Sequence, residues 1–460
     1  MRRTVLALAL VAGAGGLGAL AVLTYGADRE YQRLIATGDA ALASSRPFDA
    51  LEAYSGALAL RPDAMLAYLK RGMTYQGRGE LQNAARDLRR AVDLDPSAPR
   101  PLELLGDVNA ALTRYDRAGE SYERYLALDD RSAPVLYKLG LSRYRGGDAG
   151  AAVAPLQRAV ALEPRLAEAH YLLGLALRDE GRLHESRGSL EEATRLSPGL
   201  SAPREALADV YRALGEDRLA IDQLEALVAL EPSRPERVVA VGLSLARAGR
   251  RDAAVVALSR GIERFPGAAQ VYAALGHLWL EVAQDGTDRV ALIKAVGALS
   301  SAAARSETST EALTDYARAL MLSGDSATAE RILHQAIARV PVPPAAYLYL
   351  ADLHSRAQRR QAARDALVHY ATLVGDQEPL GSVPRQIATL SARLGEPRVA
   401  VRWFERAIDE SGSTPGLLAG LADAVAQSGD ISRARALVDE GLSIDPADAA
   451  LLRVKMRLPQ

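Results

Sequence analysis

Apolar side chains recur three and four positions apart along most of the chain, as at Leu102 and Leu105. That spacing places them on one face of an α-helix. Prolines and glycines interrupt the pattern at regular places. A proline cannot continue a helix but suits the first turn of the next one, and a glycine just past a helix end adopts the left-handed conformation that stops the helix. The pattern therefore predicts a repeating order of helix, tight turn, helix and tight turn, and an all-α fold.

The turn and packing residues share a period of 34 residues. The prolines in this phase are Pro62, Pro96, Pro164, Pro198, Pro232 and Pro266. Small residues hold a second position: Gly38, Gly72, Gly106, Gly140, Gly174, Ala208, Gly242 and Gly276. Glycines hold a third: Gly79, Gly147, Gly181, Gly215 and Gly249. Two helices approach closely only where their side chains are small, so the second series predicts the contact inside each helix pair. A period of this length predicts a stack of helical hairpins.

The window that begins at Met65 contains Tyr68, Gly72, Tyr75, Ala84, Leu88, Ala91 and Pro96. In residue type and spacing this set resembles the signature of the tetratricopeptide repeat (TPR) family. Windows in the same phase begin at Tyr31, Met65, Pro99, Ala133, Ala167, Ser201, Pro235 and Ala269, and after a break near Thr310, Pro344, Gly381 and Pro415. The resemblance implies a right-handed α-solenoid, or superhelix, of about twelve helix-turn-helix repeats preceded by one hydrophobic helix.

Departures from the period predict the domain boundaries. Residues 28–284 are expected to form a first array of eight repeats, of which the eighth is lengthened. The proline spacing then exceeds two repeats by seven residues, so residues 285–309 are expected to form an irregular joint. Residues 310–448 are expected to form a second array of four repeats, and residues 449–460 a capping helix that covers the last apolar face.

The N-terminus differs from the rest of the chain. Arg2 and Arg3 precede an uncharged stretch over residues 4–27. A membrane-spanning helix needs roughly 20 apolar residues, and flanking positive charges stay in the cytoplasm. Two interpretations remain open. A signal anchor over residues 1–27 would make a single-pass protein of a bacterial inner membrane, with the repeats on the periplasmic or other extracytoplasmic side. A signal peptide cleaved near Ala21 would release a secreted or periplasmic protein.

The resemblance also implies a binding site. In this family the first helix of each repeat lines a concave groove, which takes a peptide or a partner helix. The register places the most apolar part of that groove, with two arginines, at Tyr137, Leu141, Tyr144, Tyr171, Leu175, Arg178 and Arg212. Exposed aromatic and arginine side chains are typical interface anchors. The alternative interpretation is ordinary packing between neighbouring repeats.

Composition narrows the chemistry. The formal net charge is only −1, which gives no general attraction to nucleic acid. The chain has no cysteine, so thiol catalysis and thiolate metal sites are excluded. None of its six histidines forms a close metal-binding spacing, and no nucleotide-binding or nucleophile motif is present. We therefore expect no catalytic residue, no cofactor, no metal and no small-molecule substrate.

The sequence thus predicts a non-catalytic scaffold or adaptor whose partners are proteins or peptides, with membrane contact through residues 4–27. Two other functions remain open: a regulatory subunit of an enzyme or export complex, and a soluble exported adaptor. An enzyme in its own right is the least supported class, because no group of residues assembles a catalytic site.

Overall fold

A computed structural model provides the structure of the protein. It describes residues 26–283, 286–375 and 379–459. The predicted N-terminal hydrophobic segment lies outside the described residues, apart from its last two positions. Every regular element in the described ranges is a helix. None of the helices in these ranges combines the length and the apolar character that crossing a membrane requires.

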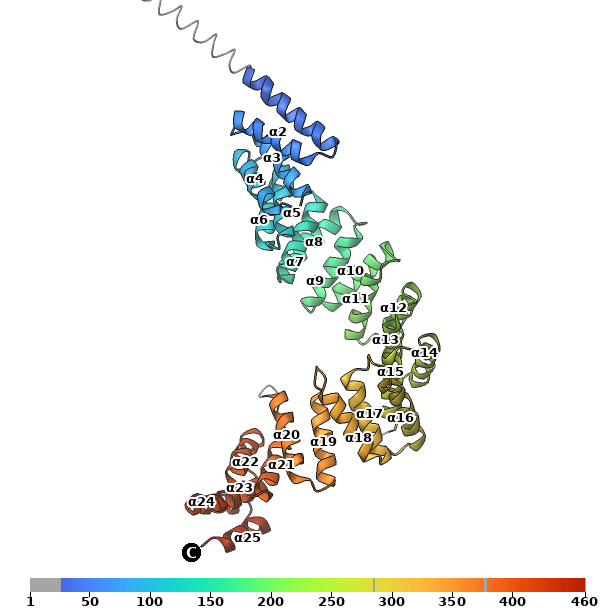
Figure 1. Ribbon diagram of the computed structural model, residues 1–460, viewed down its shortest axis with the longest axis vertical. Helices are drawn as coiled ribbons and strands as arrows, with labels where there is room; N and C mark the ends of the chain where they lie inside the picture. The colour runs from blue at the N-terminus through green and yellow to red at the C-terminus, as the bar shows by residue number, and fades with distance from the viewer. Residues whose placement is uncertain (1–25, 284–285, 376–378, 460) are drawn as a thin grey trace, which may run out of the picture. The chain divides into compact units, whose positions relative to one another are not determined.

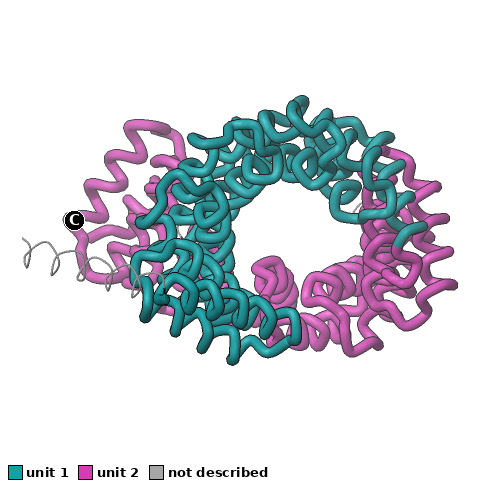
Figure 2. The backbone as a smooth tube through the Cα atoms, turned by 90° about the horizontal axis from the view of Figure 1, so that it is seen from above, with its two compact units in different colours: residues 1–230 teal, residues 231–460 magenta. Residues whose placement is uncertain are grey.

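The chain divides into two compact units, one ending at Leu230 and the other beginning at Glu231 (Figure 2). Unit 1 begins its described part with a helix over residues 26–43. The helices that follow in unit 1 are α2 (Pro47–Leu60), α3 (Met65–Gly77), α4 (Leu81–Leu94), α5 (Pro99–Ala111), α6 (Tyr115–Leu126), α7 (Ala133–Arg145), α8 (Ala149–Leu162), α9 (Ala167–Asp179), α10 (Leu183–Leu196), α11 (Ser201–Ala213) and α12 (Asp217–Leu230).

Unit 2 continues with the same alternation (Figure 1). Its helices are α13 (Pro235–Arg247), α14 (Arg251–Arg264), α15 (Ala269–Val282), α16 (Arg289–Ala303), α17 (Thr310–Ser323), α18 (Ser326–Ile337), α19 (Pro344–Arg356), α20 (Arg360–Val374), α21 (Val383–Arg393), α22 (Pro397–Ser411), α23 (Pro415–Gln427), α24 (Ile431–Ile444) and α25 (Ala449–Arg457). The described helices make six pairs in each unit, with α25 following the last pair.

Within each unit the helices pack as successive hairpins. The first helix of a pair packs against its own second helix, as α9 does against α10, and that second helix packs against the next first helix. First helices of neighbouring pairs also touch, for example α7 with α9 and α13 with α15. The structure therefore confirms the predicted all-α stack of helix pairs.

In seven of the described hairpins, a glycine of the first helix faces a large side chain of the second helix. A Cβ atom added to Gly174 of α9 would lie 2.5 Å from Cγ of Leu190 on α10. Likewise, a Cβ atom added to Gly106 of α5 would lie 2.4 Å from the Tyr122 ring on α6. Both Leu190 and Tyr122 are buried. The absent side chain at each glycine lets a large apolar side chain of the second helix reach the backbone of the first.

The turn inside each hairpin depends on a left-handed residue. Gly147 holds this position after α7 with a φ of 91°. At the same place after α5 the glycine is replaced by Thr113, which adopts the same region with a φ of 57°. A β-branched residue is strained there, because its Cβ approaches the following carbonyl. The packing of the two helices therefore determines the conformation of the turn, even where Thr113 replaces glycine.

Three predicted boundaries differ from the structure. The stretch over residues 285–309 is not irregular throughout, because it contains α16, which pairs with α15 as a second helix. Part of the excess lies in the helices, because α15 and α16 have 14 and 15 residues where α13 and α14 have 13 and 14, and part lies in residues 304–309. The two compact units meet between Leu230 and Glu231 and not at this stretch. In the eleventh pair the first helix begins at Val383 and not at Gly381, where φ is 59°.

Replacing Thr113 by glycine should raise the midpoint of thermal unfolding. Relief of the left-handed strain should raise the free energy of unfolding by roughly 1–2 kcal/mol. The larger unfolded-state entropy of glycine should lower it by about 0.5–1 kcal/mol, which leaves a net gain. The reverse change, Gly147→Thr, should lower the midpoint. Circular dichroism at 222 nm on heating measures both variants. A lower midpoint for Thr113→Gly would show that the threonine side chain stabilises this turn.

Candidate partner-binding surfaces

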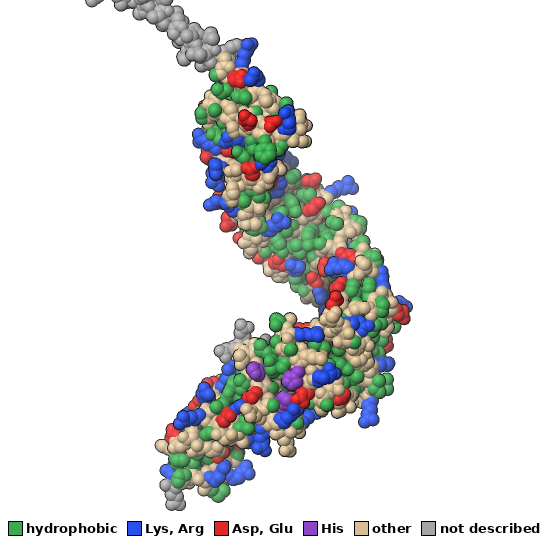
Figure 3. All heavy atoms as spheres, in the orientation of Figure 1, with side chains coloured by type: hydrophobic (Ala, Val, Ile, Leu, Met, Phe, Trp, Pro, Cys, Tyr) green, Lys and Arg blue, Asp and Glu red, His purple; other side chains and the backbone are tan. Residues whose placement is uncertain are grey.

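The predicted groove residues lie on three successive first helices of unit 1. Tyr137, Leu141 and Tyr144 are on α7, Tyr171, Leu175 and Arg178 are on α9, and Arg212 is on α11. All are half-buried except Arg212, which is exposed. Hydrophobic side chains gather on the face of this region that Figure 3 displays, with charged side chains around them.

One carboxylate connects α7 to α9. The Tyr144 hydroxyl donates to Oδ2 of Asp179 at 2.7 Å, and Nη2 of Arg178 lies 2.8 Å from Oδ1 of the same residue. Arg212 forms an ion pair with Asp209 on its own helix. The structure therefore brings Tyr144 and Arg178 together through a shared partner, while Arg212 is paired separately.

The same aromatic residues also pack between repeats. Tyr137 contacts the buried clusters on both sides of α7, and Leu141 and Tyr144 contact the cluster that contains Leu156. Tyr171 and Leu175 pack against the next cluster along the array. Each of these side chains is half-buried, so it packs between repeats and also reaches solvent. Packing between repeats and partner binding therefore do not exclude each other here. Partner binding here stays a prediction.

Burial sets the protonation of the tyrosines. Desolvation raises the pKa of Tyr144, and its hydrogen bond to Asp179 raises it further. Burial likewise raises the pKa of Tyr137 and of Tyr171, in each case as the largest effect. All three phenols stay neutral near pH 7, so they offer an apolar ring together with a hydroxyl group.

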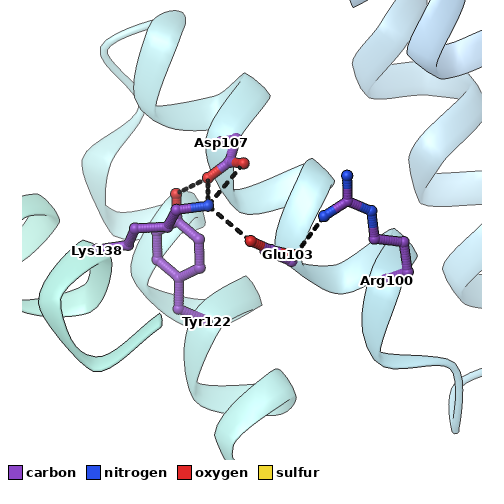
Figure 4. A network of polar contacts seen from close by, with 5 residues as sticks. All are labelled: Arg100, Glu103, Asp107, Tyr122 and Lys138. Carbon is purple, nitrogen blue, oxygen red and sulfur yellow. Dashed lines mark hydrogen bonds and ion pairs between the residues drawn. The ribbon is translucent and has the colours of Figure 1, made fainter. Parts of the chain in front are cut away.

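A second feature of unit 1 is a charged network between α5 and α7 (Figure 4). Nζ of Lys138 on α7 lies 2.8 Å from Oε1 of Glu103 and 2.9 Å from Oδ2 of Asp107, both on α5. The Tyr122 hydroxyl of α6 donates to Asp107 at 2.8 Å, and Arg100 binds the other oxygen of Glu103 at 2.7 Å. Burial lowers the pKa of Lys138, but its two carboxylate partners raise it by more, so the lysine stays charged.

The network recurs 68 residues earlier in the sequence. There the Tyr54 hydroxyl donates to Asp39 at 2.7 Å, and Lys70 binds the same carboxylate at 2.8 Å. Asp39 and Asp107 each follow the small residue of a first helix directly. The predicted groove contained two residues at this position, Leu141 and Leu175, but not the two aspartates, which the small-residue series shifted by one also includes. Its members along the array are Asp39, Met73, Asp107, Leu141, Leu175, Asp209, Leu243 and His277.

Unit 2 contains a cavity of about 670 Å³ on its first helices. Helices α13, α15 and α17 line it, together with the connection that precedes α17. Its apolar lining includes Val239, Leu243, Ala246, Ala273, Ala274 and Ala312, and its charged lining comprises Arg247, His277, Glu281, Glu307, Glu311 and Asp315. The sequence pattern did not predict this cavity, because its lining comes from three helices of separate repeats.

His277 lies between two carboxylates in this cavity. Its Nδ1 is 2.7 Å from Oδ2 of Asp315 on α17, and its Nε2 is 3.5 Å from Oε1 of Glu281 on α15. The hydrogen bond with Asp315 raises the pKa of His277, and this effect exceeds the opposing effects of burial and of Arg318. The contact therefore stabilises unit 2 fully below pH about 6.5, and this stabilisation is lost as the pH rises through the raised pKa.

Replacing Asp315 by asparagine should lower the pKa of His277, because it removes the charge that favours the imidazolium ion. An NMR pH titration of the imidazole ring signals measures the change, with His277→Gln identifying the signal. Glu263→Gln, an exposed change of equal charge on α14, is the control and should leave the titration in place. An unaltered pKa in Asp315→Asn would contradict the geometry of the cavity.

Comparisons with solved structures found chains that resemble this one at low sequence identity. YrrB, whose structure is described as a TPR protein with an unusual peptide-binding site, is 23% identical over 41% of this chain and 97% of its own, with a TM-score of 0.38. PilF of Pseudomonas aeruginosa is 23% identical over 46% of this chain and 96% of its own, with a TM-score of 0.35. The Naa15/Naa10 structure bound to HypK-THB is 17% identical over 92% of this chain and 64% of its own, with a TM-score of 0.44.

These likenesses add nothing to what the repeats themselves show about function. A comparison with curated proteins found no match. The family model described as tetratricopeptide repeat matches residues 35–99, 69–133, 137–201, 314–371 and 386–449. These stretches cover more than half of the chain, and they follow the helix pairs of both units. The protein belongs to the tetratricopeptide repeat family.

Proposed function

We propose that this protein is a non-catalytic scaffold that binds a segment of a partner protein on the first helices of its repeats. The observation that supports the proposal most directly is the cavity of unit 2. Three first helices of successive pairs, α13, α15 and α17, expose apolar and charged side chains to one space of about 670 Å³. A space of this size falls in the range of roughly 300–1,000 Å³ that is usual for ligand pockets.

Stacked helix pairs suit binding more than chemistry. Each pair contacts only its neighbours, so the array has a long accessible face and no single enclosed core. TPR proteins generally act as interaction scaffolds. Here the half-buried tyrosines of α7 and α9 form a second accessible surface, which supplies rigid aromatic area and hydroxyl groups. We infer that a partner segment contacts first helices and not the outer, second helices.

A photo-crosslinking amino acid placed on each face tests this function in living cells. Benzoylphenylalanine in place of Tyr144 on α7 or Ala273 on α15 should form adducts with the same partner protein or proteins. The matched control replaces Leu219, which is 41% exposed on the second helix α12. Mass spectrometry identifies the adducts. Equal adducts on both faces, or none at the first-helix positions, would contradict the proposal.

A double substitution tests partner binding at the tyrosines of α7 and α9. Tyr137→Ala combined with Tyr171→Ala should weaken partner capture by roughly tenfold or more, as for buried aromatic anchors at interfaces. The helical circular dichroism signal should persist, because both side chains are only half-buried. If the captured partner proves to be one enzyme in a fixed ratio, the protein is a regulatory subunit. Unchanged capture by the folded variant would leave only a packing function for these tyrosines.

We also propose that residues 4–27 anchor the protein in a bacterial inner membrane and that the repeats face the extracytoplasmic side. The support is the uncharged stretch that follows Arg2 and Arg3. An anchor would hold the scaffold beside membrane-bound partners, whereas cleavage near Ala21 would release it as a soluble adaptor. The length of the stretch favours the anchor.

The mass of the native N-terminus distinguishes the two forms. A protein purified from its own membranes should keep residues 1–27 and resist extraction with alkaline carbonate. Replacing Ala14 and Leu17 by lysine should release it, because each charge costs roughly 2.5–3.5 kcal/mol at the centre of a membrane helix. A mature protein that begins shortly after Ala21 would refute the anchor and support the exported adaptor.

A further inference from the structure

The charges around the cavity of unit 2 are unbalanced. Four carboxylates line it, from Glu281, Glu307, Glu311 and Asp315, against the guanidinium of Arg247 and the imidazole of His277. His277 is already held between Asp315 and Glu281. Glu307 and Glu311 have no ion-pair partner within the described parts of the chain, and Glu307 is exposed. Two carboxylates therefore face the cavity without a cation of the protein beside them.

Part of the lining has the opposite character. Leu243, Ala273 and Ala274 contribute small or apolar side chains and are less exposed than Glu307 and Glu311. Arginine and lysine match such a surface, because their aliphatic stems cover apolar atoms while the charged end reaches toward carboxylates. A purely apolar ligand would leave the unpaired carboxylates without a partner, and an acidic ligand would be repelled.

The lining of this cavity does not indicate a metal ion as the ligand. In the described residues there is no group of three or more histidine, aspartate or glutamate side chains that could bind a metal. The cavity spans three successive helix pairs, which fits an extended chain more closely than a compact ion. The cation that complements the cavity is therefore part of a longer molecule.

We propose that this cavity binds a basic side chain, arginine or lysine, presented by an extended peptide segment of the partner protein. The proposal rests on the scaffold function and specifies the chemistry that one of its surfaces recognises. The aliphatic stem lies along Leu243, Ala273 and Ala274. The charged end reaches Glu307 and Glu311, and arginine gains most because its planar group binds a carboxylate through two hydrogen bonds.

His277 makes this recognition dependent on pH. The groups that face the imidazole are Asp315 and Arg318 on α17 and Glu281 on α15, while Arg247 on α13 lines the same cavity. Protonation of His277 adds a positive charge where the basic side chain binds. The preference for a basic side chain therefore weakens as the pH falls from 8 to 6.

Disulfide exchange on the full chain tests the proposal without knowledge of the partner. Because the natural chain has no cysteine, Ala273→Cys introduces a single thiol at the cavity, and Ala229→Cys introduces one on the exposed side of α12 as a control. The detergent-solubilised protein is equilibrated with the symmetric disulfides of acetylated Cys-Ala-Arg amide, of its norleucine and glutamate counterparts, and of cysteamine. Each exchange forms one mixed disulfide with the protein and releases one free thiol. Mass spectrometry then gives the fraction of each adduct.

At the cavity thiol the arginine peptide should exceed the norleucine peptide by about fivefold, and the preference should shrink in high salt. The two peptides should react equally at the control thiol. Glu307→Gln combined with Glu311→Gln should abolish the preference. The matched change of charge at two exposed positions elsewhere in unit 2, Glu263→Gln with Asp409→Asn, should keep it. His277→Gln should keep the preference and remove its dependence on pH.

Three outcomes would overturn the proposal. Equal reaction of the arginine and norleucine peptides would show an apolar site, and an excess of the glutamate peptide would show an anion site. An excess of cysteamine over the arginine peptide would show a site for small amines and not for a peptide. If one of these outcomes occurs but the photo-crosslinks at first-helix positions still form, the scaffold function stands and only the proposed basic side chain is wrong. If the photo-crosslinks do not form, the scaffold function itself is wrong.

Discussion

The structure depends on one close contact that recurs in seven of the described helix pairs. A first helix carries a residue with little or no side chain, and a bulky residue of the second helix fills the space above its backbone, as Leu190 does above Gly174 and Tyr122 above Gly106. Ala208 holds the equivalent position in α11 and is buried. The contact fixes the distance between the two helices, and the left-handed residue after the first helix fixes the turn between them.

This contact also decides which residues face outward from the first helix. The residue that follows the small one cannot point into the hairpin, so it meets the next first helix or the solvent. Aspartates in this position make the ionic links to Lys70 and Lys138. Leucines in the same position, Leu141 and Leu175, pack beside the half-buried tyrosines. His277 occupies it in α15 and enters the cavity. A single register therefore generates an ionic, an aromatic and an acidic surface along the array.

The three surfaces differ in how many of their charged and apolar groups already contact other parts of the protein. In the network of Figure 4, Lys138 satisfies both neighbouring carboxylates, so little attraction remains for a partner. The tyrosines of α7 and α9 give part of their area to packing between repeats. At the cavity of unit 2, Glu307 and Glu311 keep their charge without a cation from the described chain. Among these three surfaces, the carboxylates without an ion pair in the described residues belong to the cavity, and the proposed binding of a basic side chain rests on them.

The sequence alone determined the helix pairs, because small residues, prolines and glycines act locally and recur every 34 positions. Helices α3, α5, α7, α9, α11, α13, α15, α17, α19 and α23 begin at the residues where the repeating pattern begins. It did not determine that residues 289–303 pair with α15, because longer helices and connections conceal the period there. Nor did it show that Asp315 meets His277 or that Asp179 joins Tyr144 to Arg178. Asp315 is 38 residues from His277 and Asp179 is 35 residues from Tyr144, and only the stacking of successive pairs decides which side chains converge.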